Sequence, residues 1–360
     1  MAKVYHEHYN CQKLVNSLDK NGEKPAFFIV CSKERGPGKT YSFSKMLIER
    51  FLETGEKFIL LTRNKGDIGS IAAGVMDGYL VNEHSELSIS EKSQMKDTYA
   101  RVYLSHLEKD DQGKTKQIDE ECGYIIPIRS ADKIKKISSL FYDAWCFYFD
   151  EFQPFSDPYL KDEVDLLYNI YKSIARGEGH ATRYMPVFLA SNTITLGNPY
   201  FDAFGLNKHI QSNTKFYRGE GVVYERCEVE GLAEEHAATP IDKALRVHKE
   251  RKGDNTWIMD DNSLVEKPDN WGRGYYICTL KYNGQMFGLL DYPMVGIQYV
   301  TRKTDRTCQY IYNTTKDGGS LNLPLLKQCP VFVRLKKYFY DGQVRCQDGS
   351  LQRTIIDIIA

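Results

Sequence analysis

A glycine-rich loop between an apolar run and an amphipathic helix constrains this sequence more than any other feature. The run "KPAFFIVCS", residues 24–32, is short, continuous and rich in β-formers, which predicts a strand buried on both faces. After the loop "KERGPGKT", the apolar residues Phe43, Leu47 and Phe51 recur at helical spacing, and Gly55 can end that helix. A further apolar run, "KFILLTR", predicts the next strand. This order is the opening of a βαβ fold.

The loop itself has the composition of a phosphate site. Glycines let backbone N–H groups turn inward around phosphate oxygens, a lysine reaches the β and γ phosphates, and a hydroxyl binds Mg²⁺. Gly36, Gly38, Lys39 and Thr40 meet these demands at the right spacing. Lys33 stands where the full G-x-x-x-x-G-K-[ST] pattern has glycine, and the alternative interpretation is a chance Gly-Lys-Thr in a glycine-rich turn. We predict that the loop binds a nucleotide.

Two further strand ends carry polar residues that suit the same site. Asp150 and Glu151 follow the apolar residues 144–149. In nucleotide hydrolases an aspartate at such a strand end binds Mg²⁺ and an adjoining glutamate polarises the attacking water. Asn192 ends the run "PVFLASN", where it can sense the γ-phosphate if the two strands are neighbours. The alternative is an acidic pair and an asparagine that only start turns.

Two arginines are rival charge donors. Apolar residues from Val164 to Ile174 predict a helix that ends near Arg176, where a cation complements the helix dipole. Arg35, inside the loop, is a rival that would act in cis on the nucleotide of its own subunit.

Strands that alternate with helices indicate an α/β chain with a mostly parallel sheet and helices on both faces. Residues 99–130 alternate apolar and polar side chains around "KDDQGK", which predicts an inserted hairpin. From about residue 231 the chain is polar and helix-prone, and residues 274–303 predict successive antiparallel strands before the partly helical residues 325–342. We expect three parts, residues 1–230, 231–263 and 264–360.

Charge and cysteine usage narrow the class of protein. The formal net charge of the 360 residues is zero, yet residues 264–360 hold 13 Lys and Arg against 8 Asp and Glu, an excess of +5. Nine cysteines without a C-x-x-C pair suggest neither a zinc site nor a disulfide framework. No apolar run approaches the roughly 20 residues of a membrane span, and the start "MAKVYHEHYN" lacks the apolar core of a signal peptide. We expect a cytosolic protein.

The chain resembles the DNA encapsidation ATPase of small podoviruses, the Picovirinae-type genome packaging motor. The likeness rests on "RGPGKTYS", "FYFDEF", "EVDLLYNIYKSIAR" and above all "LASNTITLGNPYF", and "YNGQMFGLLD" and the closing segment look similar too. The resemblance implies a P-loop ATPase domain of the additional-strand, catalytic-glutamate class that uses ATP and Mg²⁺. It implies a homopentameric ring that translocates double-stranded DNA into an empty prohead at the portal vertex.

The resemblance also implies partners and a location. The partners are double-stranded DNA, a prohead RNA, the portal (connector) protein and a terminal protein on the genome ends. No membrane is expected among the partners. The location is the cytoplasm of an infected bacterial host, transiently on the prohead and not in the mature virion.

Residue roles follow from the same motifs. Lys39 and Thr40 would bind phosphate and Mg²⁺, with Asp150 as the second metal ligand. Glu151 would activate water, and Arg176 would act in trans. The remaining contacts that the resemblance implies are Arg35, Gly36, Pro37, Gly38, Tyr41 and Asn192 at the nucleotide, Lys135 and Lys136 near a second trans-acting position, and Arg63 and Lys65 toward a DNA channel.

The third part resembles an RNase H-like, nuclease-derived α+β domain without its active site. Two-metal cleavage needs carboxylates that converge on ions about 4 Å apart. The few acidic residues there are isolated, and Asp291, after an apolar strand, has no evident partners. The net positive charge of residues 264–360 suits binding to phosphate backbones.

Two other functions of the whole chain stay open. One is a large terminase that both packages and cuts DNA, and the other is a non-enzymatic adaptor gated by nucleotide.

Overall fold

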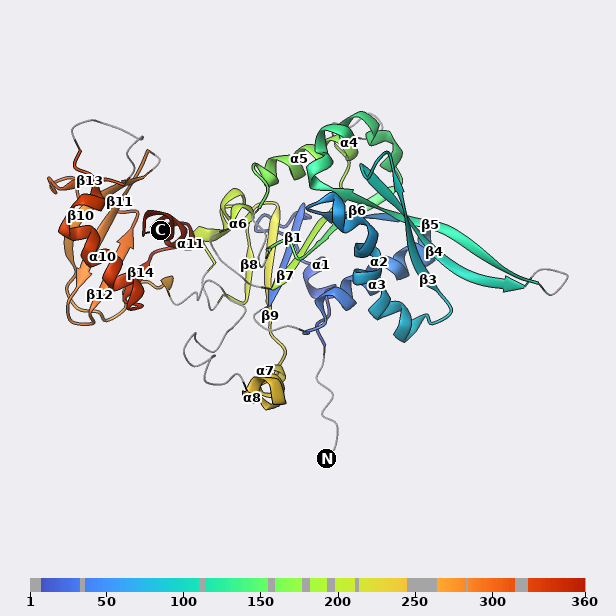
Figure 1. Cartoon of the computed structure of the whole chain (residues 1–360), viewed down its shortest axis with the longest axis horizontal. Coiled ribbons are helices and arrows are strands. Elements are labelled where there is room, and N and C mark those ends of the chain that lie inside the picture. Colours follow the sequence, from blue (N-terminus) through green and yellow to red (C-terminus); the bar gives the residue numbers. More distant parts are fainter. Residues whose placement is uncertain are drawn as a thin grey trace. The chain divides into compact units, whose positions relative to one another are not determined.

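The chain divides into two compact units (Figure 1). The first unit comprises Met1–Ile194 and Lys215–Trp257, and the second comprises Thr195–Thr214 and Ile258–Ala360. This computed structural model describes residues 8–32, 36–109, 114–154, 159–176, 182–192, 198–210, 214–244, 264–282, 284–314 and 323–359.

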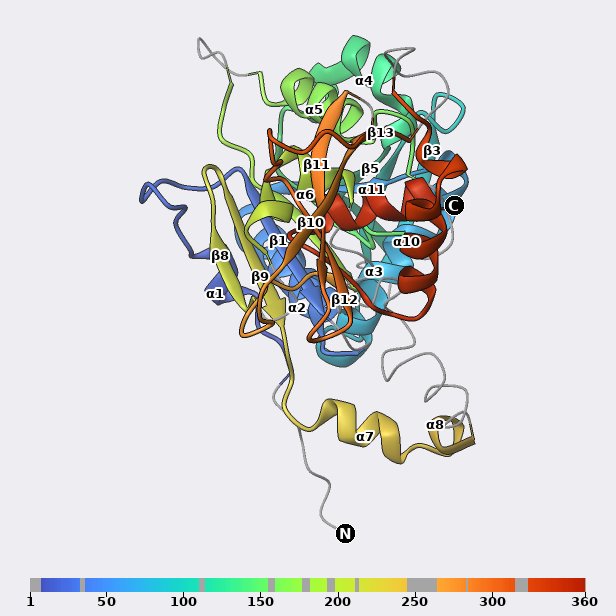
Figure 2. The ribbon, with the colours of Figure 1, turned by 90° about the vertical axis from the view of Figure 1, so that its left-hand side faces the viewer.

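A nine-stranded sheet organises the first unit, in the order β3-β4-β5-β2-β6-β7-β1-β9-β8. The six neighbouring strands β5-β2-β6-β7-β1-β9 are parallel, as the alternation of strands and helices predicted. At the two edges, β3, β4 and β8 pair antiparallel, so the sheet is mixed. Figure 2 shows β8, β9 and β1 side by side. The bounds are β1 Phe27–Ser32, β2 Lys57–Thr62, β3 Ser88–Gln94, β4 Tyr99–Lys109, β5 Thr115–Pro127, β6 Ala144–Asp150, β7 Val187–Asn192, β8 Phe216–Arg218 and β9 Val222–Cys227.

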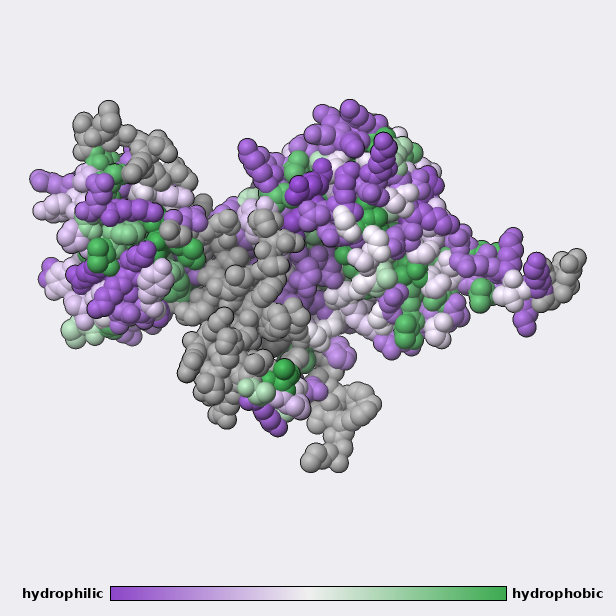
Figure 3. Space-filling view, viewed as in Figure 1, coloured by the Kyte–Doolittle hydropathy of each residue, from purple (hydrophilic) through white to green (hydrophobic). Residues whose placement is uncertain are grey.

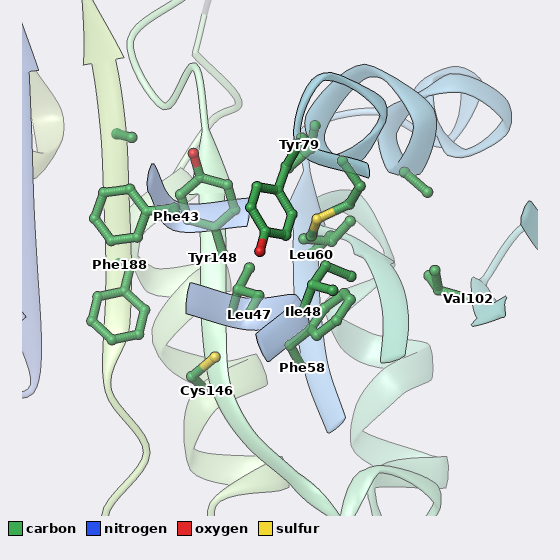
Figure 4. Close-up of a cluster of buried hydrophobic side chains, with 14 of the residues drawn as sticks. Phe43, Leu47, Ile48, Phe58, Leu60, Tyr79, Val102, Cys146, Tyr148 and Phe188 are labelled. Carbon is green, nitrogen blue, oxygen red and sulfur yellow. The ribbon is translucent and has the colours of Figure 1, made fainter. Parts of the chain in front are cut away.

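Helices cover both faces of this sheet. On one face, Phe43 of α2 stacks on Tyr148 of β6 at 5.1 Å between ring centroids, within a core that also holds Leu47 and Phe188 (Figure 4). Successive strand residues point to opposite faces, so Phe147 of β6 lies on the other face of the sheet from Tyr148. There its ring centroid lies 5.9 Å from that of Tyr171 of α5. The helices are α1 Gln12–Val15, α2 Lys39–Thr54, α3 Ile68–Glu83, α4 Ala131–Ile137, α5 Glu163–Ile174, α7 Leu232–Ala238 and α8 Pro240–Ala244, with short 3₁₀ helices at Lys65–Asp67, Ile128–Ser130 and Ser138–Phe141.

Two of these helices show how the sequence sets their limits. Gly55 follows α2 in the left-handed conformation, with a φ of 73°, and its N–H donates to the carbonyl of Phe51, as the predicted stop requires. Phe43, Leu47 and Phe51 are buried along one stripe of the helix. The predicted helix before Arg176 is α5, which ends at Ile174.

The predicted inserted hairpin is present as β4 and β5, which pair antiparallel and project from the sheet as a long arm (Figure 1). The inner half of β5 is buried, whereas most residues of its outer half are exposed. Figure 3 shows mostly hydrophilic side chains along the arm. The exposed half therefore adds little to the core of the unit.

The second unit has a five-stranded sheet in the order β13-β10-β11-β12-β14. The central strands β10 to β12 are antiparallel, as predicted, and β13 and β14 pair parallel at the edges. At the start of α6, the Asn198 side chain accepts from the Phe201 N–H at 2.9 Å and Pro199 takes the first helical position. The bounds are β10 Tyr275–Tyr282, β11 Gln285–Tyr292, β12 Ile297–Thr301, β13 Ile311–Asn313, β14 Val344–Cys346, α6 Pro199–Ala203, α10 Pro330–Tyr340 and α11 Gly349–Ile359, with 3₁₀ helices at Leu206–Lys208 and Leu326–Gln328.

No helix within the described ranges has the length and apolar content needed to cross a membrane.

Candidate nucleotide site

The candidate site lies where the carboxyl ends of β1, β7 and β6 meet. The strand β7 separates β1 from β6, and Ser32 of β1 lies opposite Asn192 of β7 in the parallel register. Asp150 of β6 lies opposite Ala190 of the same strand. The strands that carry Asp150 and Asn192 are therefore neighbours, which is the condition that the expected role of Asn192 requires. Ligands of α/β sheets bind at this edge.

The loop that follows β1 uses backbone conformations that favour glycine. Gly36 and Gly38 have φ angles of 77° and 95°. A Cβ on Gly38 would also lie 3.1 Å from the Cβ of His8, so His8 packs closely against this glycine. The N–H of Tyr9 fixes this contact by donating to the Pro37 carbonyl at 2.8 Å. Lys33 and Arg35 lie outside the described residues.

Lys39 begins α2, and its ammonium is buried, with the residue 6% exposed. It donates to the hydroxyl of Ser32 and, at 3.0 Å, to the amide oxygen of Asn192. Burial lowers its pKa, against the opposing charge of nearby groups such as Asp150. Within the described part of the chain it has no ion pair. A phosphate would supply the missing anion, so the observed environment fits the predicted ligand.

Thr40 and Asp150 form the other half of the site. The Thr40 hydroxyl donates to Oδ2 of Asp150 at 2.8 Å, which brings the two predicted Mg²⁺ ligands together across 110 residues of sequence. Burial raises the pKa of Asp150, and the hydrogen bond from Thr40 and the charge of Lys39 oppose that shift. A hydroxyl beside a carboxylate is a donor set that suits Mg²⁺. These residues therefore fit the predicted cation.

Glu151 stands in a strained backbone conformation. Its φ is 54°, in the left-handed region that residues other than glycine seldom adopt. Its N–H donates to Oδ1 of Asp150 at 3.2 Å, and the next residue, Phe152, is fully buried. The strained turn leaves Glu151 exposed directly beside Asp150. Such strain gathers at functional sites because the surrounding structure must hold it in place.

Arg63 does not have the exposed position that a DNA contact needs. It is 8% exposed and makes a bidentate ion pair with Glu163, with both N–O distances at 2.8 Å. Its Nη2 also donates to the Phe152 carbonyl at 2.7 Å. The prediction that Arg63 faces a DNA channel is therefore wrong for this structure, because a buried partner already neutralises the guanidinium.

The other predicted residues lie on the outer parts of the unit. Arg176 is exposed just beyond α5, and in the described chain its side chain has no ion pair or hydrogen bond. Lys135 and Lys136 are exposed on the last turn of α4. Lys65 is half-buried and its Nζ donates to the Lys96 carbonyl at 3.3 Å. Tyr41, which was predicted at the nucleotide, donates its hydroxyl to Glu83 of α3 at 2.8 Å.

The sequence interpretation missed Ser32 and Glu163. Ser32 is the last residue of β1 and is fully buried, so its hydroxyl holds Lys39 next to Asn192. Its role depends on the register between β1 and β7, which no local pattern gives. In the sequence, Glu163 has the position of an ordinary acidic residue in the first turn of a helix. Its ion pair with Arg63 forms only in the folded chain.

A lysine and a threonine at the start of a helix, facing an aspartate on a nearby strand end, are the arrangement that the phosphate-loop pattern predicts for a nucleotide-binding protein. The comparisons with known proteins identify the family. The profile of the family described as "Podovirus DNA encapsidation protein (Gp16)" matches residues 5–356, so the chain belongs to that family. Its function is therefore viral DNA packaging, as the sequence resemblance predicted.

Two relatives cover almost the whole chain. The DNA packaging protein of Bacillus phage B103 is 24% identical over 329 residues, which are 89% of this chain and 92% of the relative. The DNA packaging protein of Bacillus phage phi29 is 23% identical over 354 residues, 96% of this chain and 95% of the relative. A solved chain of "The bacteriophage Phi-29 viral genome packaging motor assembly" has a TM-score of 0.63 at 21% identity and 98% coverage of both chains, which shows the same fold.

Proposed function

We propose that this chain is an ATPase that translocates double-stranded viral DNA into an empty prohead at the portal vertex. One observation carries the proposal: Lys39, Thr40 and Asp150 converge at the carboxyl edge of the parallel sheet. The position of β7 between β1 and β6 supports the additional-strand class, in which one strand separates the phosphate loop from the acidic pair.

The residues of the site divide the work of phosphoryl transfer. Lys39 and the backbone N–H groups of the loop would hold the β and γ phosphates of ATP, and Thr40 and Asp150 would hold Mg²⁺. When bound, the cation neutralises charge on the phosphate oxygens. Glu151, beside Asp150, would orient and deprotonate the attacking water. The amide of Asn192, already bonded to Lys39, would report the state of the γ-phosphate.

A ring of subunits would complete the site. Arg176 is exposed beyond the end of α5, which supports a role in trans on the nucleotide of a neighbouring subunit. Lys135 and Lys136 are candidates for a second trans-acting position, since both are exposed on α4. Arg35 would act on the phosphates of its own subunit. A homopentamer is the assembly that we propose, with the portal protein, a prohead RNA and a terminal protein as further partners.

The third part, residues 264–360, would bind nucleic acid rather than cut it. The order β12-β11-β10-β13, with three antiparallel strands and a parallel fourth, supports an RNase H-like origin. Asp291, the one candidate remnant of a nuclease site, makes an ion pair with Arg334 at 2.7 Å. The described residues contain no group of three or more His, Cys, Asp or Glu that could hold a metal ion. Residues 1–230 would form the ATPase domain, except that Thr195–Thr214 belong to the second compact unit, and residues 231–263 would form a linker. The protein would act in the cytoplasm of an infected bacterium.

Steady-state ATP hydrolysis with and without double-stranded DNA tests the proposal. The wild-type protein should hydrolyse ATP and respond to DNA, and Lys39→Ala should abolish hydrolysis because it removes the phosphate-binding ammonium. ATP binding without turnover would instead favour a nucleotide-gated adaptor. Metal-dependent nicking of plasmid DNA would favour a large terminase with an active nuclease.

A further inference from the structure

A cavity of 460 Å³ lies at the edge of the main sheet opposite the candidate nucleotide site. It is bordered by Lys24 and Pro25 before β1, by Trp145 at the start of β6 and by Pro186 before β7, all at the amino ends of parallel strands. Its volume falls within the roughly 300–1,000 Å³ of small-molecule sites. Since the phosphate loop lies at the carboxyl ends, a ligand in this cavity is separate from the one bound by Lys39.

The charges on the wall of the cavity do not balance. Lys24, Arg50 and Arg183 border it, with Glu56 as a carboxylate partner. Arg50 already uses Glu56, since both its Nε and its Nη2 lie 2.7 Å from Oε2 of that residue. Lys24 and Arg183 make no ion pair within the described part of the chain, so the cavity presents two cations that an anion could neutralise.

Hydrogen bonds to the backbone hold the guanidinium of Arg183 in place. Its Nη2 donates to the carbonyl of Ala144 at 2.8 Å and lies 3.4 Å from that of Phe141, which fixes the guanidinium against β6. Burial lowers the pKa of Arg183, and the nearby charge of Asp143 only opposes the shift. A guanidinium that is fixed by backbone carbonyls and partly removed from water gains more from an anionic ligand than an exposed one does.

Four aromatic side chains form part of the wall. Phe28 and Phe188 are 2% and 0% exposed, and the Arg50 guanidinium lies over the Trp145 ring, 4.1 Å from its centre. Tyr184, which is 49% exposed, is therefore the ring of these four that a ligand can reach. The Tyr184 hydroxyl donates to the Pro25 carbonyl at 3.0 Å, and the ammonium of Lys24 lies 5.7 Å from the centre of the Tyr184 ring. Exposed aromatic rings beside cations are the surfaces on which nucleic-acid bases stack while their phosphates are neutralised.

We propose that this cavity binds a nucleoside phosphate, with the phosphate at Lys24 and Arg183 and the base against the ring of Tyr184. A free nucleotide and one nucleotide of a nucleic-acid strand present the same chemistry. The cavity does not depend on the proposed ATPase function, because none of its residues belongs to the candidate nucleotide site.

Calorimetric titration of the full-length Lys39→Ala protein tests the proposal, because that variant lacks the lysine of the phosphate loop. The probes are AMP, adenosine, a single-stranded RNA decamer and a duplex DNA of the same length, all in buffer without divalent metal. We expect saturable binding of AMP or of a strand, and at least about tenfold weaker binding of adenosine, because a charge-assisted hydrogen bond is worth that factor or more.

Substitutions in the same background locate the site. Lys24→Gln and Arg183→Gln should each weaken binding by at least about tenfold. Lys92→Gln is the matched control, because Lys92 also lies over a tyrosine ring, at 4.4 Å from that of Tyr103, but on β3. If Arg183→Gln loses its fold with the bond to Ala144, Lys24→Gln decides the outcome alone.

The outcomes separate the sources of the ligand. AMP binding that is lost in Lys24→Gln supports a free nucleotide. Binding of the RNA or DNA strand alone, with the same loss, supports a nucleotide within a strand. The proposal is overturned if none of the probes binds, or if Lys24→Gln and Arg183→Gln bind them as tightly as the control.

Discussion

Removing one partner of the ion pair between Arg63 and Glu163 should strongly destabilise the first unit. The side chains of Arg63 and Glu163 are 8% and 0% exposed. Glu163 also accepts the Leu160 N–H at 2.8 Å, and Arg63 holds the Phe152 carbonyl, so the pair ties the end of β2 to the segment between β6 and α5. Arg63→Gln would leave a buried carboxylate uncompensated, which costs about 3–5 kcal/mol of unfolding free energy.

Urea denaturation of the full chain, followed by circular dichroism, measures this loss. Glu163→Gln should be similarly destabilising, and a double variant, Arg63→Met with Glu163→Leu, should recover much of the loss because it removes both buried charges. The control is Lys20→Gln, since the pair of Lys20 and Glu220 is 50% and 75% exposed and should leave the midpoint nearly unchanged. A loss below about 1 kcal/mol in Arg63→Gln would refute the reasoning and reopen a surface role for this arginine.

Four further outcomes are expected. Glu151→Gln should keep ATP binding in a filter assay but lower turnover by at least about 100-fold, and near-normal turnover would reject its role as general base. Arg176→Ala and Lys39→Ala proteins should each be nearly inactive, yet recover ATPase activity when they are mixed. In a mixed ring, an Arg176→Ala subunit keeps its own Lys39 and would receive the arginine of a Lys39→Ala neighbour. If Arg176 only caps the helix, the Arg176→Ala protein should stay active by itself. Asp150→Asn should raise the denaturation midpoint of the nucleotide-free protein at neutral pH. Burial raises the pKa of Asp150, so the cost of ionising this carboxyl in the folded state grows as the pH rises above the pKa that it has in the unfolded chain. A difference in midpoint between the variant and the wild type that stays the same from acid to neutral pH would contradict this. A fragment that begins near Leu264 should bind duplex DNA or structured RNA weakly and lose affinity steeply with salt, and salt-insensitive binding would count against the charge argument.

Local patterns were sufficient for the elements that the candidate site needs. The apolar runs before the loop and before Asp150 became β1 and β6, and the helical spacing after Lys39 became α2. These signals are strong because strands buried on both faces and amphipathic helices each have a distinct period. Sequence reasoning could also infer that Asp150 and Asn192 lie at one sheet edge, since parallel strands share a carboxyl edge.

Contacts between distant segments could not be predicted in the same way. The sequence predicted an exposed, unpaired Arg63, because its partner Glu163 comes 100 residues later and neither residue has a local signal of burial. The contact between Tyr9 and the Pro37 carbonyl, and that of Ser32 with Asn192, likewise depend on how the strands are ordered. A cation that looks available for DNA in a sequence is therefore a weak indicator until its burial is known.

The electrostatics of the candidate site explain why the binding of nucleotide and of a divalent metal would be linked there. Burial lowers the pKa of Lys39 and raises that of Asp150, so each charge is unfavourable in the protein without its ligand. A phosphate would stabilise the charged form of Lys39, and a divalent cation would stabilise that of Asp150. Lys39 is next to Thr40 in the chain, and the Thr40 hydroxyl donates to Asp150, so ATP with Mg²⁺ would relieve both costs at once. ATP without the metal would relieve only one, so we expect nucleotide affinity to fall when divalent metal is chelated.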